Sequence, residues 1–151
     1  MSAIASDTQR IETLLQHYGD GTKGDAPTRT QWEKILERGQ DAPITLINFF
    51  KFYETARYAG DSELTGSGKE AFERYASVSG PALQRAGGKF LLVAPFEHMF
   101  AGEEEDWDVI AIGSYPGTTA LLDLFEDKAY QGCFFHRTAA CAKQKVYIAS
   151  A

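Results

Sequence analysis

A chain of 151 residues with 44% hydrophobic and 13% aromatic content is long and apolar enough for one domain with a packed core. Its net charge of −6 argues against nucleic acid or an anionic membrane surface as a partner, because both bind basic patches. The N-terminal segment has neither the basic nor the apolar region of a secretory signal, and no apolar run has the roughly 18 residues of a membrane span. These features predict a cytoplasmic protein, in which Cys133 and Cys141 are reduced, buried and structural.

The first 42 residues contain two amphipathic helical patterns, which we interpret as an N-terminal extension. Ser6 and Gln9 have the spacing of a capping box, which marks the start of the first helix. Thr30 and Glu33 mark the start of the second helix in the same way. The apolar faces consist of Ile11, Leu14, Leu15 and Tyr18 in the first helix and of Trp32, Ile35 and Leu36 in the second. Faces of this size predict that both helices pack against the rest of the protein.

The segment between these two helices is rich in glycine. Gly19, Gly21 and Gly24 match the letters of the dinucleotide-binding fingerprint G-x-G-x-x-G. That fingerprint should follow a strand and open a helix, whereas this segment follows a helix and runs into Pro27. We therefore interpret residues 19–28 as a flexible linker.

The main domain is predicted over residues 43–151, and its first strand covers residues 44–50. Asn48 is the only polar residue in the interior of this strand, where asparagine is disfavoured. Its side chain either caps a neighbouring backbone group or hydrogen-bonds a ligand, and both interpretations stay open. The connection over residues 51–66 is long enough for a lid or a binding loop.

A helix is predicted after this connection, because Ser67 and Glu70 form a third capping box and Gly87 allows left-handed backbone at the end. The next strand covers residues 89–100, and Pro95 inside it indicates an edge position or a bulge. Acidic residues then fill positions 103–106. Because the side chains of adjacent loop residues diverge into solvent, we predict an exposed loop there and no metal site.

A third strand is predicted at residues 107–115, where β-branched and aromatic residues dominate. By period two, Trp107 shares one face with Ala111 and Tyr115. A short final strand is predicted at residues 143–151.

Helical spacing resumes after residue 117, and this part of the chain ends with Tyr130, His136 and Arg137. His136 and Arg137 are adjacent, so on a helix their side chains diverge by about 100° and only one of them points into a given pocket. In a structural interpretation, Arg137 pairs with Asp108 or caps a carbonyl, and it holds the last helix against the sheet. In a functional interpretation, Arg137 clamps a substrate carboxylate or enolate and His136 transfers a proton. Both interpretations stay open.

The main domain therefore has the element order strand, helix, strand, strand, helix, strand. This order is the split βαβ or ferredoxin-like arrangement of an α+β protein, with a four-stranded antiparallel sheet. The strands carry apolar residues on both faces, whereas two helices cover only one face. We expect the other face to bury against a second copy of the chain in a homodimer.

A set of residues spread over these elements carries a resemblance to a known family. The set consists of Asn48 and Phe52, Tyr75, Gly87-Gly88, Trp107-Asp108, Tyr115-Pro116, and Tyr130 with His136-Arg137. Through these residues, the segment from about residue 43 to residue 148 resembles the domain-of-unknown-function family numbered 1330, within the dimeric α+β barrel superfamily. The resemblance implies a ferredoxin-like dimer and no settled activity. Related branches of the superfamily include cofactor-free monooxygenases, lactone isomerases and haem-handling enzymes, with ligands between sheet and helices.

Two classes of function remain. The first is a small-molecule-binding protein, whose predicted ligand-binding residues are Asn48, Tyr75, Trp107, Asp108, Tyr115 and Tyr130. The second is a cofactor-independent isomerase, lyase or monooxygenase that acts on a small aromatic or enolisable acid. In that enzyme His136 is the base, and Arg137 and Asn48 stabilise the anion. No cofactor is predicted, although haem bound through His136 is a further alternative.

Overall fold

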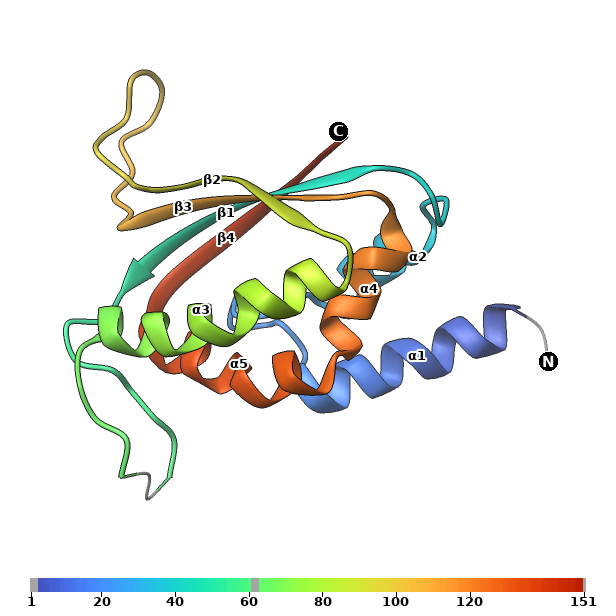
Figure 1. The fold of residues 1–151 in the computed structure, drawn as a ribbon, viewed down its shortest axis with the longest axis horizontal. Coiled ribbons are helices and arrows are strands. Elements are labelled where there is room, and N and C mark those ends of the chain that lie inside the picture. Colours follow the sequence, from blue (N-terminus) through green and yellow to red (C-terminus); the bar gives the residue numbers. More distant parts are fainter. Residues whose placement is uncertain (1–2, 61–62, 151) are drawn as a thin grey trace.

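The structure, a computed structural model, describes residues 3–60 and 63–150 of the chain (Figure 1). The elements in chain order are α1 (Ala3–Tyr18), α2 (Arg29–Leu36), β1 (Ile44–Phe52), α3 (Gly68–Arg85), β2 (Lys89–Pro95), β3 (Val109–Tyr115), α4 (Thr118–Glu126), α5 (Lys128–Ala140) and β4 (Cys141–Ser150). No helix within the described residues is both long enough and apolar enough to cross a membrane.

The strands form one antiparallel sheet in the order β2-β3-β1-β4. This order and the helical crossovers confirm the predicted ferredoxin-like α+β fold. As predicted from Pro95, β2 lies at an edge of the sheet and ends at this residue. The central strand β1 places Asn48 opposite Ala111 of β3 and Val146 of β4, so these three strands are held in a defined register.

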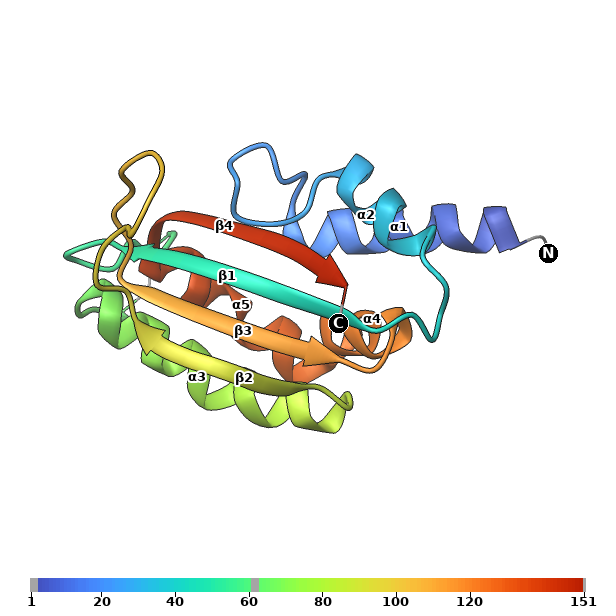
Figure 2. The same ribbon diagram turned by 90° about the horizontal axis from the view of Figure 1, so that it is seen from above.

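Helices cover only one face of the sheet. We call the face toward α3 and α5 the inner face and the opposite face the outer face (Figures 1 and 2). By strand alternation, Leu46, Asn48 and Phe50 of β1 belong to the inner face, and Ile47 and Phe49 belong to the outer face. Figure 2 looks onto the outer face, with α3 and α5 behind the sheet and no helix in front of it.

The N-terminal extension packs against the main domain, in agreement with its apolar faces. Figure 2 shows α1 and α2 beyond the β4 edge of the sheet. The Tyr18 hydroxyl donates a hydrogen bond to the carbonyl of Phe125 in α4, and the ring of Trp32 lies 5.3 Å from the ring of Phe125. Arg10 of α1 forms an ion pair with Glu126. The extension therefore shares one continuous core with the main domain.

The helix ends follow local capping chemistry, with two corrections to the predicted positions. Helix α1 begins at Ala3, upstream of the predicted start at Ser6. Helix α2 is capped by Thr28 and Gln31, two residues before the predicted pair, because Thr28 is the residue with extended backbone next to the first helical turn. The predicted box of α3, Ser67 with Glu70, is confirmed.

The C-terminal end of α3 is closed by Gly87, which has the left-handed φ of 97° that favours glycine. Its amide donates to the carbonyl of Gln84, and the amide of Gly88 donates to the carbonyl of Leu83 over 2.9 Å. These two bonds form a Schellman motif and turn the chain into β2.

The helical segment after residue 117 is divided into two helices at Asp127. The amide of Asp127 donates to the carbonyl of Leu124 at the end of α4. Its side chain then accepts a hydrogen bond of 3.0 Å from the amide of Tyr130 in the first turn of α5, and it also pairs with Arg85 of α3. This one residue therefore ends α4, starts α5 and joins α5 to α3.

We expect Asp127→Ala to lower the free energy of unfolding by about 1 kcal/mol, because the first turn of α5 loses its cap. Asp127→Asn is the matched control, since an asparagine retains the acceptor oxygen while it removes the charge. The measurement is urea unfolding followed by circular dichroism. Equal losses in the two variants would show that the ion pair with Arg85, and not the cap, stabilises this junction.

Candidate functional site

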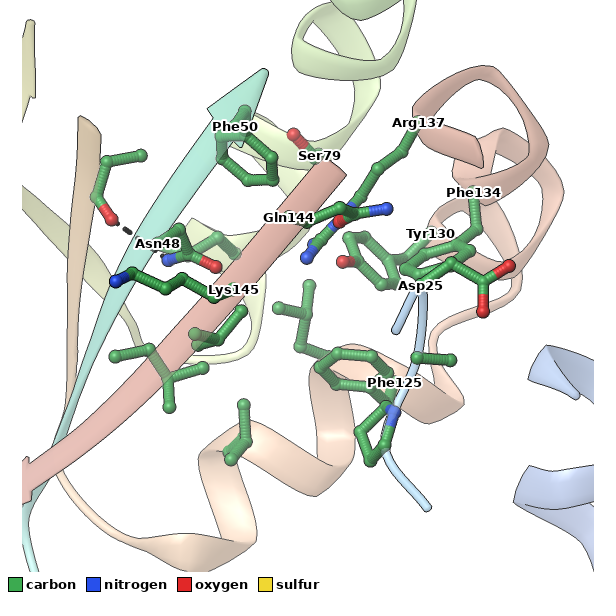
Figure 3. Close-up of a pocket in the computed structure, with 18 of the residues that line it drawn as sticks. Asp25, Asn48, Phe50, Ser79, Phe125, Tyr130, Phe134, Arg137, Gln144 and Lys145 are labelled. Atoms are coloured by element: carbon green, nitrogen blue, oxygen red, sulfur yellow. Dashed lines mark hydrogen bonds between the residues drawn. The ribbon is translucent and has the colours of Figure 1, made fainter. Parts of the chain in front are cut away.

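A cavity of about 450 Å³ lies between the inner face of the sheet and the helices (Figure 3). Its volume is within the range of small-molecule sites. Most of the wall is apolar and aromatic. The uncharged polar side chains in the wall include Asn48, Tyr75, Ser79, Tyr115, Tyr130 and Gln144. The charged residues of this wall are Arg137, Asp25 and Lys145 (Figure 3).

Arg137 reaches the cavity because of its position on α5. Tyr130, Phe134 and Arg137 are spaced by four and three residues, so all three share the helix face turned toward the sheet. Gln144 faces them from β4, where it pairs with Phe50 in the strand register. The cap at the start of α5 and the register of β4 thus fix both sides of this part of the site.

The guanidinium of Arg137 is buried, with 8% of the residue exposed, and its partners are neutral. Its Nε donates to Oε1 of Gln144 over 2.8 Å, and its Nη1 donates to the hydroxyl of Tyr75 over 3.2 Å. The guanidinium carbon lies 4.9 Å from the ring centre of Phe50 and 5.2 Å from that of Phe134. No carboxylate in residues 3–60 or 63–150 forms an ion pair with it.

One hydrogen-bond donor next to Arg137 is unpaired. The Nε2 amide nitrogen of Gln144 is buried and has no hydrogen-bond partner among the described residues. The Gln144 oxygen already accepts from Arg137, so the free group at this position is a donor. A buried cation beside an unpaired donor is costly in an empty site and suits a ligand with an anionic acceptor.

Tyr75 and Tyr130 form a buried pair of hydroxyls beside Arg137, with their oxygen atoms 2.7 Å apart. Burial raises the pKa of Tyr130 well above its ordinary value, and the neighbouring Tyr75 raises it further, although Arg137 acts in the opposite direction. Burial likewise raises the pKa of Tyr115. Tyr130 and Tyr115 are therefore neutral at physiological pH and act as hydrogen-bonding groups, not as bases.

Asn48 satisfies a backbone group and also lines the cavity. Its Nδ2 donates to the carbonyl of Ala111 over 2.9 Å (Figure 3). The interpretation of Asn48 as a cap for neighbouring backbone is thus observed, and its side chain remains part of the wall.

The predicted pair between Arg137 and Asp108 is wrong. A carboxylate oxygen of Asp108 instead accepts from the amide of Phe52 over 2.7 Å, and the other lies 3.7 Å from the amine of Lys51. Asp108 thus stabilises the end of β1 and does not line the cavity. Arg137 does join α5 to the sheet, but its partner there is Gln144 of β4 and not Asp108.

Trp107 also lies outside the cavity, contrary to prediction. Strand alternation fails for this residue because β3 begins only at Val109. The Trp107 ring packs 5.6 Å from the ring of Phe49 on the outer face, with the amine of Lys143 4.7 Å from the ring centre. Its indole nitrogen donates to Glu105 over 2.7 Å.

His136 points away from the cavity, as the angular separation from Arg137 on the helix predicts for one of the two. Its Nδ1 lies 2.7 Å from the hydroxyl of Tyr58, which accepts a hydrogen bond of 2.9 Å from Arg74. With Arg74 as its donor, the Tyr58 hydroxyl is placed to donate a hydrogen bond to Nδ1 of a neutral His136, and this contact ties the loop over residues 53–60 to α5. The predicted role of His136 as a base beside Arg137 is corrected by this placement.

Sequence reasoning missed the part of the wall that the glycine-rich segment forms. Gly21 and residues 24–28 line the cavity, so this segment not only links α1 to α2 but also forms part of the site. Gly21 has a φ of 76°, and a Cβ atom there would lie 2.5 Å from the carbonyl oxygen of Ala26. This contact shows a tight turn that only glycine permits, a signal that the positions of the glycines alone did not reveal.

The other candidate reactive groups are the two cysteines and the acidic segment. Cys133 and Cys141 are buried and unpaired, and burial raises the pKa of their thiols to about 11 and about 12, respectively. In the acidic segment, Glu105 binds Lys145 and Asp106 binds Lys51. No group of three His, Cys, Asp or Glu side chains in the described part of the chain converges as a metal site requires.

Comparison with known proteins gives a family and two similar folds. Residues 62–151 match the family described as domain of unknown function (DUF1330). Two similar crystal structures are those of RPA0582, a protein of unknown function from Rhodopseudomonas palustris, and of methylated RPA0582. Each is 27% identical over 83% of this chain, with 95% and 93% of the other chain covered and TM-scores of 0.74 and 0.75. Among curated proteins, no match to this chain was found.

The placement of His136 predicts a pH dependence. Burial lowers the pKa of His136, and the charge of Arg74 lowers it further, so the folded protein favours the neutral ring. Its contribution to stability is complete above the ordinary histidine pKa and is lost as the pH falls below about 6.5, through the lowered value. We expect His136→Gln, which retains an acceptor for Tyr58, to weaken the fall in thermal stability between about pH 7 and pH 5. His98→Gln, at an exposed position, is the control and should leave the slope unchanged.

Proposed function

The chain belongs to the family described as domain of unknown function (DUF1330), and on this premise we propose that the protein binds a small apolar or aromatic acid in the cavity between sheet and helices. The observation that carries the proposal is the buried guanidinium of Arg137, which has only neutral partners among the described residues. A carboxylate, or a comparable anion such as an enolate, supplies the missing charge and accepts from the fork of Arg137.

The surroundings of Arg137 match the two parts of such a ligand. Gln144 offers a free amide donor beside the guanidinium, which suits the second oxygen of a carboxylate. Most of the rest of the wall is apolar and aromatic, and rings such as those of Phe50 and Phe125 suit an uncharged hydrocarbon or aromatic body.

The alternative function is a cofactor-independent enzyme that acts on a small aromatic or enolisable acid. It requires a group that accepts a proton next to the bound acid. His136, the predicted base, is hydrogen-bonded to Tyr58 outside the cavity, and the raised pKa of Tyr130 makes that residue a donor. Arg137 and Tyr130 can stabilise an anion but do not abstract a proton, so we place binding before catalysis.

The binding proposal predicts a loss of affinity without a loss of stability. Arg137→Met should weaken the binding of aromatic carboxylates at least about tenfold, because the charge-assisted hydrogen bonds disappear. Its unfolding temperature should change little, because the lost hydrogen bonds to Gln144 and Tyr75 are offset by the removal of a buried cation and the change strands no buried carboxylate. Arg57→Met, which removes the same charge from an exposed position, is the control. Isothermal titration with phenylbutyrate and with its uncharged amide measures both affinities, and equal binding of acid and amide by the unchanged protein would refute the proposal.

We also propose that the protein is a homodimer whose subunits meet through the outer face of the sheet. Ile47 lies at the centre of this face, between Ile112 of β3 and Tyr147 of β4 in the strand register. These side chains form an apolar surface that no helix of the same chain covers (Figure 2). A second copy would bury this surface and protect it from water.

Ile47→Asp tests the dimer, because an unpaired charge in the centre of an apolar interface opposes association. We expect the unchanged protein to have the mass of a dimer in light scattering and the variant to have the mass of a monomer. Phe100→Asp changes a fully exposed residue away from the sheet face and should leave the dimer intact. A monomeric unchanged protein at micromolar concentration would contradict the proposal.

A further inference from the structure

Trp32 brings an unpaired hydrogen-bond donor into the wall of the cavity. It belongs to α2 in the N-terminal extension, and only 1% of the residue is exposed. Its side chain is part of the cavity wall, and its indole Nε1 is buried without a hydrogen-bond partner in residues 3–60 and 63–150. The indole nitrogen is only a donor, and buried tryptophans usually pair this group.

The residues packed against the ring of Trp32 are apolar, and no described residue pairs with its indole N–H. The ring packs edge to face against Phe125, with ring centres 5.3 Å apart, and it belongs to the same apolar cluster as Ile35 and Leu121. Trp107, the other tryptophan of the chain, donates its indole N–H to Glu105. The unpaired indole is therefore the one that lines the cavity.

Trp32 and Arg137 approach the cavity from different elements. Arg137 and the free amide of Gln144 come from α5 and β4, whereas Trp32 comes from α2, which stands outside the segment 62–151 matched by the family. All of these groups donate hydrogen bonds. A ligand that pairs them needs an acceptor at more than one point.

We propose that the ligand is an acid that carries a second hydrogen-bond acceptor, such as a ketone oxygen, on its apolar body. The carboxylate binds Arg137 and Gln144, and the second oxygen accepts from the indole N–H of Trp32. The N-terminal extension thereby selects oxygen-bearing acids over their hydrocarbon counterparts. This inference rests on the proposed binding of an acid beside Arg137.

The first test compares two acids of nearly equal shape, phenylbutyrate and benzoylpropionate, which differ by one ketone oxygen. Longer homologues, phenylvalerate and benzoylbutyrate, extend the comparison to another spacing. We expect the full chain to prefer the keto acid of one pair by roughly 2- to 10-fold in isothermal titration, the range of one net hydrogen bond. In Trp32→Phe this preference should disappear, whereas Arg137→Met should weaken both acids of the pair together. The ratio of the two affinities distinguishes the effect of the lost indole N–H from the effect of a general change in cavity shape.

A second measurement uses the unchanged protein and does not depend on the folding of a variant. In a nuclear magnetic resonance titration, the indole N–H signal of Trp32 should shift downfield with the keto acid and much less with the plain acid. The signal of Trp107 is the internal control, because its N–H is bonded to Glu105 outside the cavity. Equal affinities within each pair together with an unmoved Trp32 signal would overturn this inference and leave acid binding intact. If none of these acids binds, both proposals fail.

Discussion

The constraint on which the site depends is the guanidinium of Arg137, which is buried without a counter-ion in the part of the chain that the structure describes. Arg137 is held by the amide oxygen of Gln144, by the hydroxyl of Tyr75 and by contact with the faces of Phe50 and Phe134. These partners come from β4, α3, β1 and α5, so the charge is kept in place only when all four elements are docked. Neutral hydrogen bonds and aromatic faces offset part of the desolvation of a cation, but they do not replace the attraction of a carboxylate.

The other side of the cavity depends on the break between α4 and α5. Asp127 ends one helix and caps the next, which separates the face with Leu124 and Phe125 from the face with Tyr130 and Arg137. Phe125 is then available to Tyr18 and Trp32 of the extension. The extension thus completes the core and the cavity at once, and a ligand would meet side chains from both the main domain and the first 42 residues.

The fold could be read from the sequence because its signals are local. Alternation and Pro95 indicate the strands and the edge position from a few neighbouring residues. Capping boxes indicated the presence of the helices, but only the box at Ser67 and Glu70 gave the correct start. The partner of Arg137 could not be predicted from the sequence. Asp108 and Gln144 both belong to predicted strands, and only the strand register decides which of them Arg137 contacts. The divergence of His136 and Arg137 follows from helix geometry alone, but which of them enters the cavity depends on how α5 packs. The cap at Asp127 was present in the sequence and was overlooked, whereas the turn at Gly21 required coordinates.

The protonation of the donors in the cavity wall determines how the affinity for an acid depends on pH. Arg137 stays charged throughout the physiological range, the raised pKa of Tyr130 keeps its hydroxyl neutral, and Gln144 and Trp32 do not titrate. His136, whose pKa is lowered by burial and by the charge of Arg74, is separated from the cavity by its orientation on α5 and contacts Tyr58. The donors of the site therefore keep the same form from weakly acidic to weakly basic solution. Under these conditions, the ionisation of the acid itself would govern its affinity, and the protein would discriminate ligands by the number and position of their acceptor atoms.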